Sequence, residues 1–134
     1  MEILRSKELP LQSAEDVIRA RFEAKLWTEQ MQFLLIDRTK VITAVSELAR
    51  NAVQHGGGGI VRFEEIRNHR GLGLRVVFED QGPGIADISL ALRDGYSTAG
   101  GLGLGLGGAK RLTDEFDIQS APGKGTKVTV IKWK

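Results

Sequence analysis

The chain has 134 residues, of which 41% are hydrophobic and 27% charged, and its formal net charge is +2. This length is typical of one domain with its own core, so we expect residues 1–134 to form a single domain. The absence of cysteine excludes disulfides, cysteine–zinc sites and cysteine nucleophiles. The weak charge argues against a nucleic-acid partner, and the sequence has no pattern of a membrane span or secretory signal. These features predict a cytoplasmic protein that binds neither nucleic acid nor membrane.

The first half of the chain carries one strand pattern and two helix patterns. Residues 2–9 are consistent with a strand, and Ser13 is placed to cap a helix that runs from about residue 14 into the high twenties. Asp37 is placed to cap a second helix, in which apolar residues recur from Val41 at intervals of four, three and four. We expect this helix to end at residues 56–59, four consecutive glycines that readily adopt left-handed backbone conformations.

The second half predicts four strands, a glycine-rich loop and a third helix. The strand patterns lie at residues 60–68, 72–79, 116–121 and 126–133. Residues 81–107 predict a loop with a short helix near 88–94, and the third helix begins within 103–107 and runs to about Glu115. The order of the elements predicts an α/β two-layer sandwich, in which a mixed, mostly antiparallel sheet carries its helices on one face.

Two polar residues on the second helix are candidates for chemistry. Glu47 and Asn51 lie four residues apart and project from the same face of the helix. The asparagine amide oxygen is a hard ligand that suits Mg²⁺, and the glutamate could accept a proton from a hydroxyl or water. A pair of this kind most often forms a solvated helix face, so its functional interpretation depends on the motifs that accompany it.

Three further motifs contain glycine. Asp80-Gln-Gly82-Pro-Gly84 follows a predicted strand, and is either a turn or a place where the carboxylate accepts a hydrogen bond from an exocyclic amine such as that of adenine. Residues 100–108 alternate glycine with leucine before a helix, which favours an anion cradle over a flexible linker. Gly125-Thr126 opens the final strand. The dinucleotide fingerprint and the Walker A motif lack their required context here.

In combination, these motifs resemble the four sequence boxes of the GHKL ATP-binding superfamily over about residues 37–133. The boxes are Glu47-x-x-x-Asn51, Asp80-x-Gly82-x-Gly84, Gly101-x-Gly103-x-Gly105 and Gly125-Thr126. More narrowly, three segments resemble the RsbT switch kinases, small serine-protein kinases of bacterial partner-switching pathways. These segments are residues 46–51, 94–98 and 111–116.

The resemblance implies a Bergerat-type ATP-binding fold with ATP and Mg²⁺ as cofactors. It implies that Asn51 holds Mg²⁺ on the triphosphate and that Glu47 is the base toward the hydroxyl of a protein serine or threonine. It also implies an adenine contact at Asp80, with supporting or phosphate-lining roles for Gly82, Gly84, Thr126, Gly101, Gly103 and Gly105.

The same resemblance implies protein partners. The substrates would be STAS-domain proteins of a stressosome, and phosphorylation would release the kinase to activate an output phosphatase or cyclase. Two alternatives stay open at this point. One is an anti-sigma factor of the same superfamily, which binds a sigma factor and phosphorylates its antagonist. The other is an ATP-sensing adaptor without catalysis.

Overall fold

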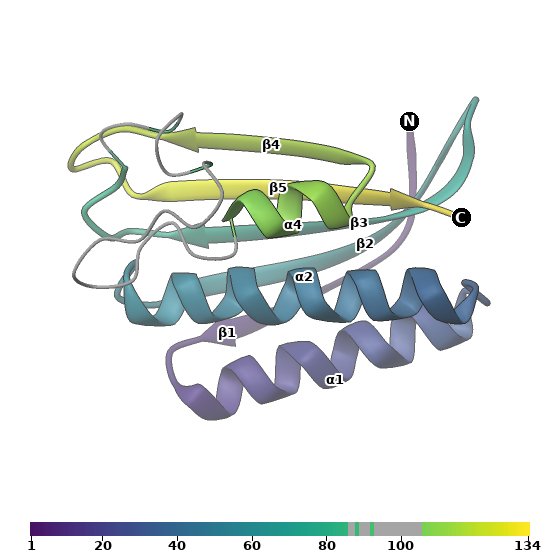
Figure 1. The fold of residues 1–134 in the computed structure, drawn as a ribbon, viewed down its shortest axis with the longest axis horizontal. Coiled ribbons are helices and arrows are strands. Elements are labelled where there is room, and N and C mark those ends of the chain that lie inside the picture. The colour runs from purple at the N-terminus through teal and green to yellow at the C-terminus, as the bar shows by residue number, and fades with distance from the viewer. Residues whose placement is uncertain (86–87, 89–91, 93–105) are drawn as a thin grey trace.

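The computed structural model describes residues 1–85, 88, 92 and 106–134 of the chain. Eight elements follow one another in the predicted order (Figure 1). They are β1 (Glu2–Leu11), α1 (Ala14–Gln30), α2 (Leu35–Gln54), β2 (Gly59–Asn68), β3 (Gly71–Asp80), α4 (Leu106–Leu112), β4 (Glu115–Ser120) and β5 (Thr126–Trp133). No helix in this part of the chain is long and apolar enough to cross a membrane.

The five strands form one sheet in the order β1-β2-β3-β5-β4. Figure 1 shows α1, α2 and α4 on the same face of this sheet, which confirms the predicted two-layer architecture. All four pairings of the described strands are antiparallel, so the parallel contribution expected of a mixed sheet is not found among them. The end of β3 and the start of β5 lie side by side, because Asp80 pairs with Thr126. Both strands contact α2, which in turn contacts α4.

The core lies between α2 and the inner face of the sheet. The helix buries its apolar stripe of Val41, Val45, Leu48 and Ala52, as the spacing predicts. On the sheet, alternate residues of β3 and β5 point inward and meet this stripe, because successive side chains of a strand face opposite sides. These inward residues are Leu74, Val76, Phe78, Val128 and Val130.

Two helix boundaries differ from the prediction, and tertiary contacts explain both. Ser13 caps α1 as expected and accepts a hydrogen bond from the backbone N–H of Asp16. Asp37 does not cap α2, which begins at Leu35; the Asp37 carboxylate lies in the first turn, 3.6 Å from the Lys132 ammonium. The third helix ends at Leu112, before Glu115, because the next residues turn into β4. There the Asp114 carboxylate accepts the backbone N–H of Trp133 at 2.7 Å.

The short helix expected near residues 88–94 falls mostly outside the described residues. Ile88 and Leu92 are described, and the backbone N–H of Leu92 donates to the Ile88 carbonyl at 3.0 Å. Both side chains pack against the core.

The buried phenylalanine of β2 provides a test of this core. Phe63 is fully buried and its ring centroid lies 5.8 Å from that of Trp27 on α1. We expect Phe63→Ala to lower the free energy of unfolding by about 3–5 kcal/mol, because it leaves a cavity between α1 and the sheet.

Phe22→Ala is the matched control for this substitution. Phe22 lies on α1 and is 58% exposed, so its loss should change the free energy of unfolding by less than about 1 kcal/mol. Urea denaturation of both variants measures the difference. Equal destabilisation would contradict the packing described for Phe63.

Candidate functional site

A pocket lies where the C-terminal half of α2 meets the end of β3, the start of β5 and the start of α4. Three segments far apart in the sequence supply its polar residues: Asn51 from α2, Asp80 from β3 and Thr126 from β5. Gly84, four residues after Asp80, also lines the pocket. Four of the residues singled out from the sequence therefore converge on one hollow, although up to 75 positions separate them along the chain.

The rest of the pocket wall is largely apolar. The apolar side chains come from the helical layer and from the inner face of the sheet, and they are Leu48, Phe78, Ile85, Leu106 and Val128. An apolar wall beside a few convergent polar groups is typical of a small-molecule site. Phe78 of β3 and Val128 of β5 belong both to this wall and to the hydrophobic core.

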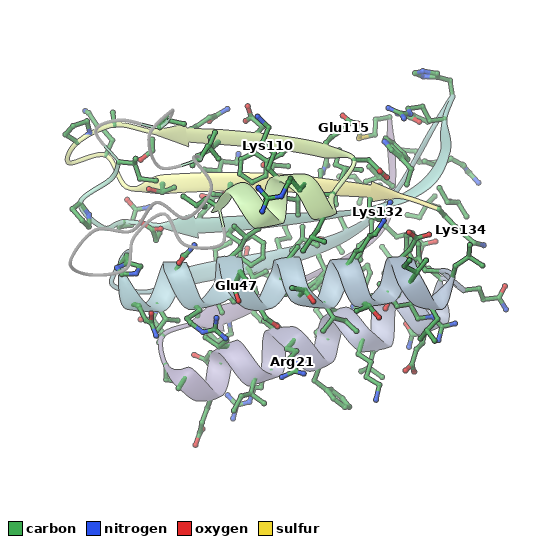
Figure 2. The ribbon with its side chains drawn as sticks, viewed as in Figure 1. Arg21, Glu47, Lys110, Glu115, Lys132 and Lys134 are labelled. Carbon is green, nitrogen blue, oxygen red and sulfur yellow. The ribbon has the colours of Figure 1, made fainter. Side chains whose placement is uncertain are left out.

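Asn51 and Glu47 occupy different parts of this site. Residues 48, 51, 52 and 55 of α2 line the pocket, since they share one face of the helix. Glu47 is not in the lining; it lies one turn before Asn51, toward solvent, with a side chain that is 35% exposed. Its carboxylate forms an ion pair with the guanidinium of Arg50 at 3.0 Å. Figure 2 shows Glu47 on α2.

Asp80 ends β3 between the beginnings of two other strands. Its sheet partners are Gly59 of β2 and Thr126 of β5. The backbone N–H of Gly82 donates to Oδ1 of Asp80 at 3.0 Å, which fixes the carboxylate over the pocket. Burial raises the pKa of the Asp80 carboxyl above its ordinary value of 3.8, and backbone hydrogen bonds at Gly82 and Thr126 partly offset this rise.

Glycines surround the Asp80 carboxylate because the chain leaves no room for larger residues. A Cβ on Gly56, the second residue after α2, would collide with the Asp80 side chain. A Cβ on Gly82 would approach the backbone of Gly56 in turn. Gly84 has a φ of +78°, a backbone conformation that is strained for any residue with a side chain. A Cβ at this position would also collide with the Ala121 carbonyl. Gly56 was not singled out from the sequence, where it is one of four consecutive glycines.

The hydroxyl of Ser120, a second residue that the sequence did not indicate, organises the Thr126 side of the site. Ser120 Oγ accepts the backbone N–H of Ile85 at 2.8 Å and donates to the Gly125 carbonyl at 2.8 Å. It also lies 2.9 Å from Oγ1 of Thr126. One partly buried hydroxyl thus joins the segment after Gly84 to the start of β5. No motif marks such a serine; only the strand register reveals it.

Gly82 is not among the residues that line the pocket. The other residues to be placed are the glycines at positions 101, 103 and 105, the two cations of α4, and His55. Gly101, Gly103 and Gly105 lie among residues whose structure is not described, directly before Leu106. Lys110 and Arg111 are exposed on α4, and Figure 2 shows Lys110 on the helical face. His55 ends α2 and lines the pocket, and its backbone N–H donates to the Asn51 carbonyl at 2.9 Å.

Comparison with known proteins identifies the family. Residues 36–134 match the family model described as histidine kinase-, DNA gyrase B- and HSP90-like ATPase. The chain is 43% identical over 118 residues to the serine/threonine-protein kinase RsbT of Bacillus subtilis, covering 88% of this chain and 89% of that protein. It is 31% identical over 119 residues to the anti-sigma F factor of Clostridium kluyveri, covering 84% and 82%.

A solved structure agrees with the fold. The RsbU and RsbW domains of a Mycobacterium tuberculosis protein superpose with a TM-score of 0.67 and 19% identity, covering 96% of this chain and 32% of that one. The expected GHKL resemblance is therefore confirmed. The chain belongs to the histidine kinase-, DNA gyrase B- and HSP90-like ATPase family, and within it to the ATP-dependent serine/threonine-protein kinases of the RsbT type.

Proposed function

We propose that the protein transfers the γ-phosphate of ATP to a serine or threonine of a STAS-domain protein, and then activates an output phosphatase or cyclase by changing partners. The similarity to RsbT and to anti-sigma F factors supports a partner-switching kinase. The observation that carries the proposal is the convergence of Asn51, Asp80 and Thr126 on one pocket. We further propose that residues 1–134 act as one cytoplasmic domain of a stressosome pathway, since β1 pairs with β2 and α1 packs on α2.

In this proposal the adenine base lies in the pocket against its apolar wall. The Asp80 carboxylate accepts a hydrogen bond from the exocyclic amine of adenine, and Thr126 supports the same edge of the base. Gly82 and Gly84 let the base approach the backbone closely, because neither position has room for a side chain. The hydrogen bond from the Gly82 N–H holds Asp80 in place for this contact.

The phosphates extend from the pocket toward α4. Gly101, Gly103 and Gly105 would line them with backbone N–H groups. Mg²⁺ in nucleotide sites takes one or two protein ligands and completes its shell with phosphate oxygens and water. The donor set fits this pattern, because Asn51, which carries a neutral amide oxygen, lines the same pocket as Asp80. When bound there, Mg²⁺ would neutralise charge on the triphosphate.

Glu47 is the proposed catalytic base. It lies on the solvent side of Asn51, where a hydroxyl of another protein can reach it, and the ion pair with Arg50 orients its carboxylate. The carboxylate takes the proton of the serine or threonine hydroxyl as the oxygen bonds to the γ-phosphorus. The bond from that phosphorus to the bridging oxygen breaks, and ADP leaves. Positioning and charge neutralisation supply most of the rate in such a transfer.

The alternative is an anti-sigma factor that binds a sigma factor and phosphorylates its antagonist. The 31% identity to anti-sigma F factors favours it, and the 43% identity to RsbT favours the switch kinase. Pull-down distinguishes the two. Retention of a sigma factor supports the alternative, whereas retention of a STAS-domain protein supports the first proposal.

Replacing the proposed base should separate binding from transfer. We expect Glu47→Gln to bind ATP with unchanged affinity and to phosphorylate a STAS-domain substrate about 10²–10⁴-fold more slowly, because the amide cannot take the proton. Transfer from radiolabelled ATP with Mg²⁺ measures the rate. Glu29→Gln, which changes an exposed carboxylate on α1, is the control and should retain the normal rate. A normal rate in Glu47→Gln would remove Glu47 from this role.

Replacing Asn51 should act through the metal. We expect Asn51→Ala to weaken ATP binding about tenfold or more when Mg²⁺ is present, because a charge-assisted contact is lost. In EDTA the variant and the wild type should bind ATP with similar affinity. Titration calorimetry under both conditions tests this. An equal loss of affinity with and without Mg²⁺ would show that Asn51 does not act through the metal.

The raised pKa of Asp80 predicts a pH-dependent difference in stability. Because the folded protein holds this proton more tightly than the unfolded chain, wild-type stability falls as pH rises from about 3.8 through the raised pKa. Asp80→Asn does not titrate, so its free energy of unfolding minus that of the wild type should rise across this interval and then level off.

Urea denaturation at a series of pH values measures this difference, with ADP titration at neutral pH alongside. We expect Asp80→Asn to lose about tenfold or more in ADP affinity while remaining folded, because the acceptor for the adenine amine is changed. A stability difference that is constant with pH, or that falls as pH rises, would contradict the burial described for this carboxyl.

A further inference from the structure

The solvent side of α1 carries two parallel rows of side chains that the nucleotide site does not use. Ile18 and Phe22, four residues apart, are 67% and 58% exposed. Arg21 and Lys25, also four residues apart, run beside them and are exposed. Residues at this spacing lie one above the other on a helix, so an apolar row and a basic row extend along the same direction. We name Ile18, Arg21, Phe22 and Lys25 the α1 ridge.

The α1 ridge borders a hollow on the side of α2. Ile18, Phe22 and Ile42 supply its apolar lining, and Arg21 and Lys25 supply its charge. Large apolar side chains that lie together in a rim of polar ones are typical of protein interaction sites. The exposed apolar residues and the hollow thus coincide with the basic row.

The charges on the two sides of the ridge differ. Toward β1, the cations already have partners: Lys7 lies 2.8 Å from Glu23, and Arg19 lies 3.0 Å from Asp16. Toward α2, neither Arg21 nor Lys25 forms an ion pair with another residue in the part of the chain that the structure describes. An acidic surface is therefore complementary to the α2 side of the ridge.

We propose that the α1 ridge binds an acidic amphipathic helix of a partner protein. Apolar side chains of that helix would contact Ile18, Phe22 and Ile42, and carboxylates at neighbouring i,i+4 positions would meet Arg21 and Lys25. A second copy of this chain is a poorer occupant, because a twofold contact centred on the ridge brings the unpaired cations of both copies together.

This surface is separate from the pocket. Figure 1 shows α1 and α4 on opposite sides of α2, and Figure 2 shows Arg21 on α1 and Lys110 on α4. A partner bound to the ridge leaves the nucleotide pocket accessible. The inference rests on the proposed function only in that partner switching requires protein partners. A measurement of nucleotide binding tests the proposed function and leaves the α1 ridge untested, so the two proposals can fail separately.

Two synthetic peptides of about 15 residues test the proposal. Both carry leucines at i,i+4 spacing, and one has glutamates and the other lysines in the adjacent row. With the full chain, we expect the glutamate peptide to shift the backbone NMR signals of Ile18, Phe22 and Ile42, and the lysine peptide to leave them unchanged. The double substitution Arg21→Glu/Lys25→Glu should weaken the glutamate peptide about tenfold or more, since two attractions become two repulsions.

The control substitution is Lys124→Glu/Lys134→Glu, which makes the same change in net charge at two exposed positions away from α1, in the turn before β5 and directly after β5. It should leave peptide affinity unchanged, and both double variants should bind ADP like the wild type. Equal shifts with both peptides, no shift with either, or self-association of the free chain that Phe22→Ser abolishes would each overturn the proposal. If the wild-type protein does not bind ADP, the proposed function is wrong, and the proposal for the α1 ridge is unaffected.

Discussion

The close approach of α2 to the end of β3 is the constraint on which the site depends. Gly56 lies so near Asp80 that no side chain fits between them, and Gly82 packs on Gly56 from the other direction. The end of the helix that carries Asn51 therefore packs closely against the Asp80 side chain and against the backbone that follows it. The proposed magnesium ligand and the proposed adenine acceptor are therefore brought to one pocket by this contact.

The polar groups of the site differ in their burial and in their hydrogen-bond partners. Partial burial of Asp80 is costly for a carboxylate, and the N–H of Gly82 offsets part of that cost. On the Thr126 side of the site, the Ser120 hydroxyl accepts a hydrogen bond from the backbone N–H of Ile85 and donates one to the carbonyl of Gly125. Glu47, in contrast, needs access to another protein and lies at the half-exposed margin. The proposed binding groups thus lie partly buried at the pocket, and the proposed catalytic group lies outside its lining.

The sequence predicted the order of the elements well, because periodicity and local caps determine it. Ser13 caps α1 through a bond to a residue three positions away, which a local pattern captures. Asp37 was assigned wrongly, because its partner is Lys132 on the last strand and local spacing does not reveal such a contact. The convergence of Asn51, Asp80 and Thr126 followed from motif order. Gly56 and Ser120 were missed because only strand register and helix placement bring them to the site.

The ion pairs of Lys132 affect how the site responds when α2 tilts. Its ammonium lies 3.6 Å from Asp37 and 3.0 Å from Asp114 and is only 13% exposed, so it fastens the N-terminal turn of α2 to the segment between α4 and β4. Asn51 lies about 24 Å further along the helix axis, at about 1.5 Å per residue from Leu35. With one end anchored, a tilt of about 5° displaces Asn51 by about 2 Å and leaves Asp37 nearly still. A small reorientation of α2 therefore moves Asn51, the proposed magnesium ligand, much more than it moves Asp37.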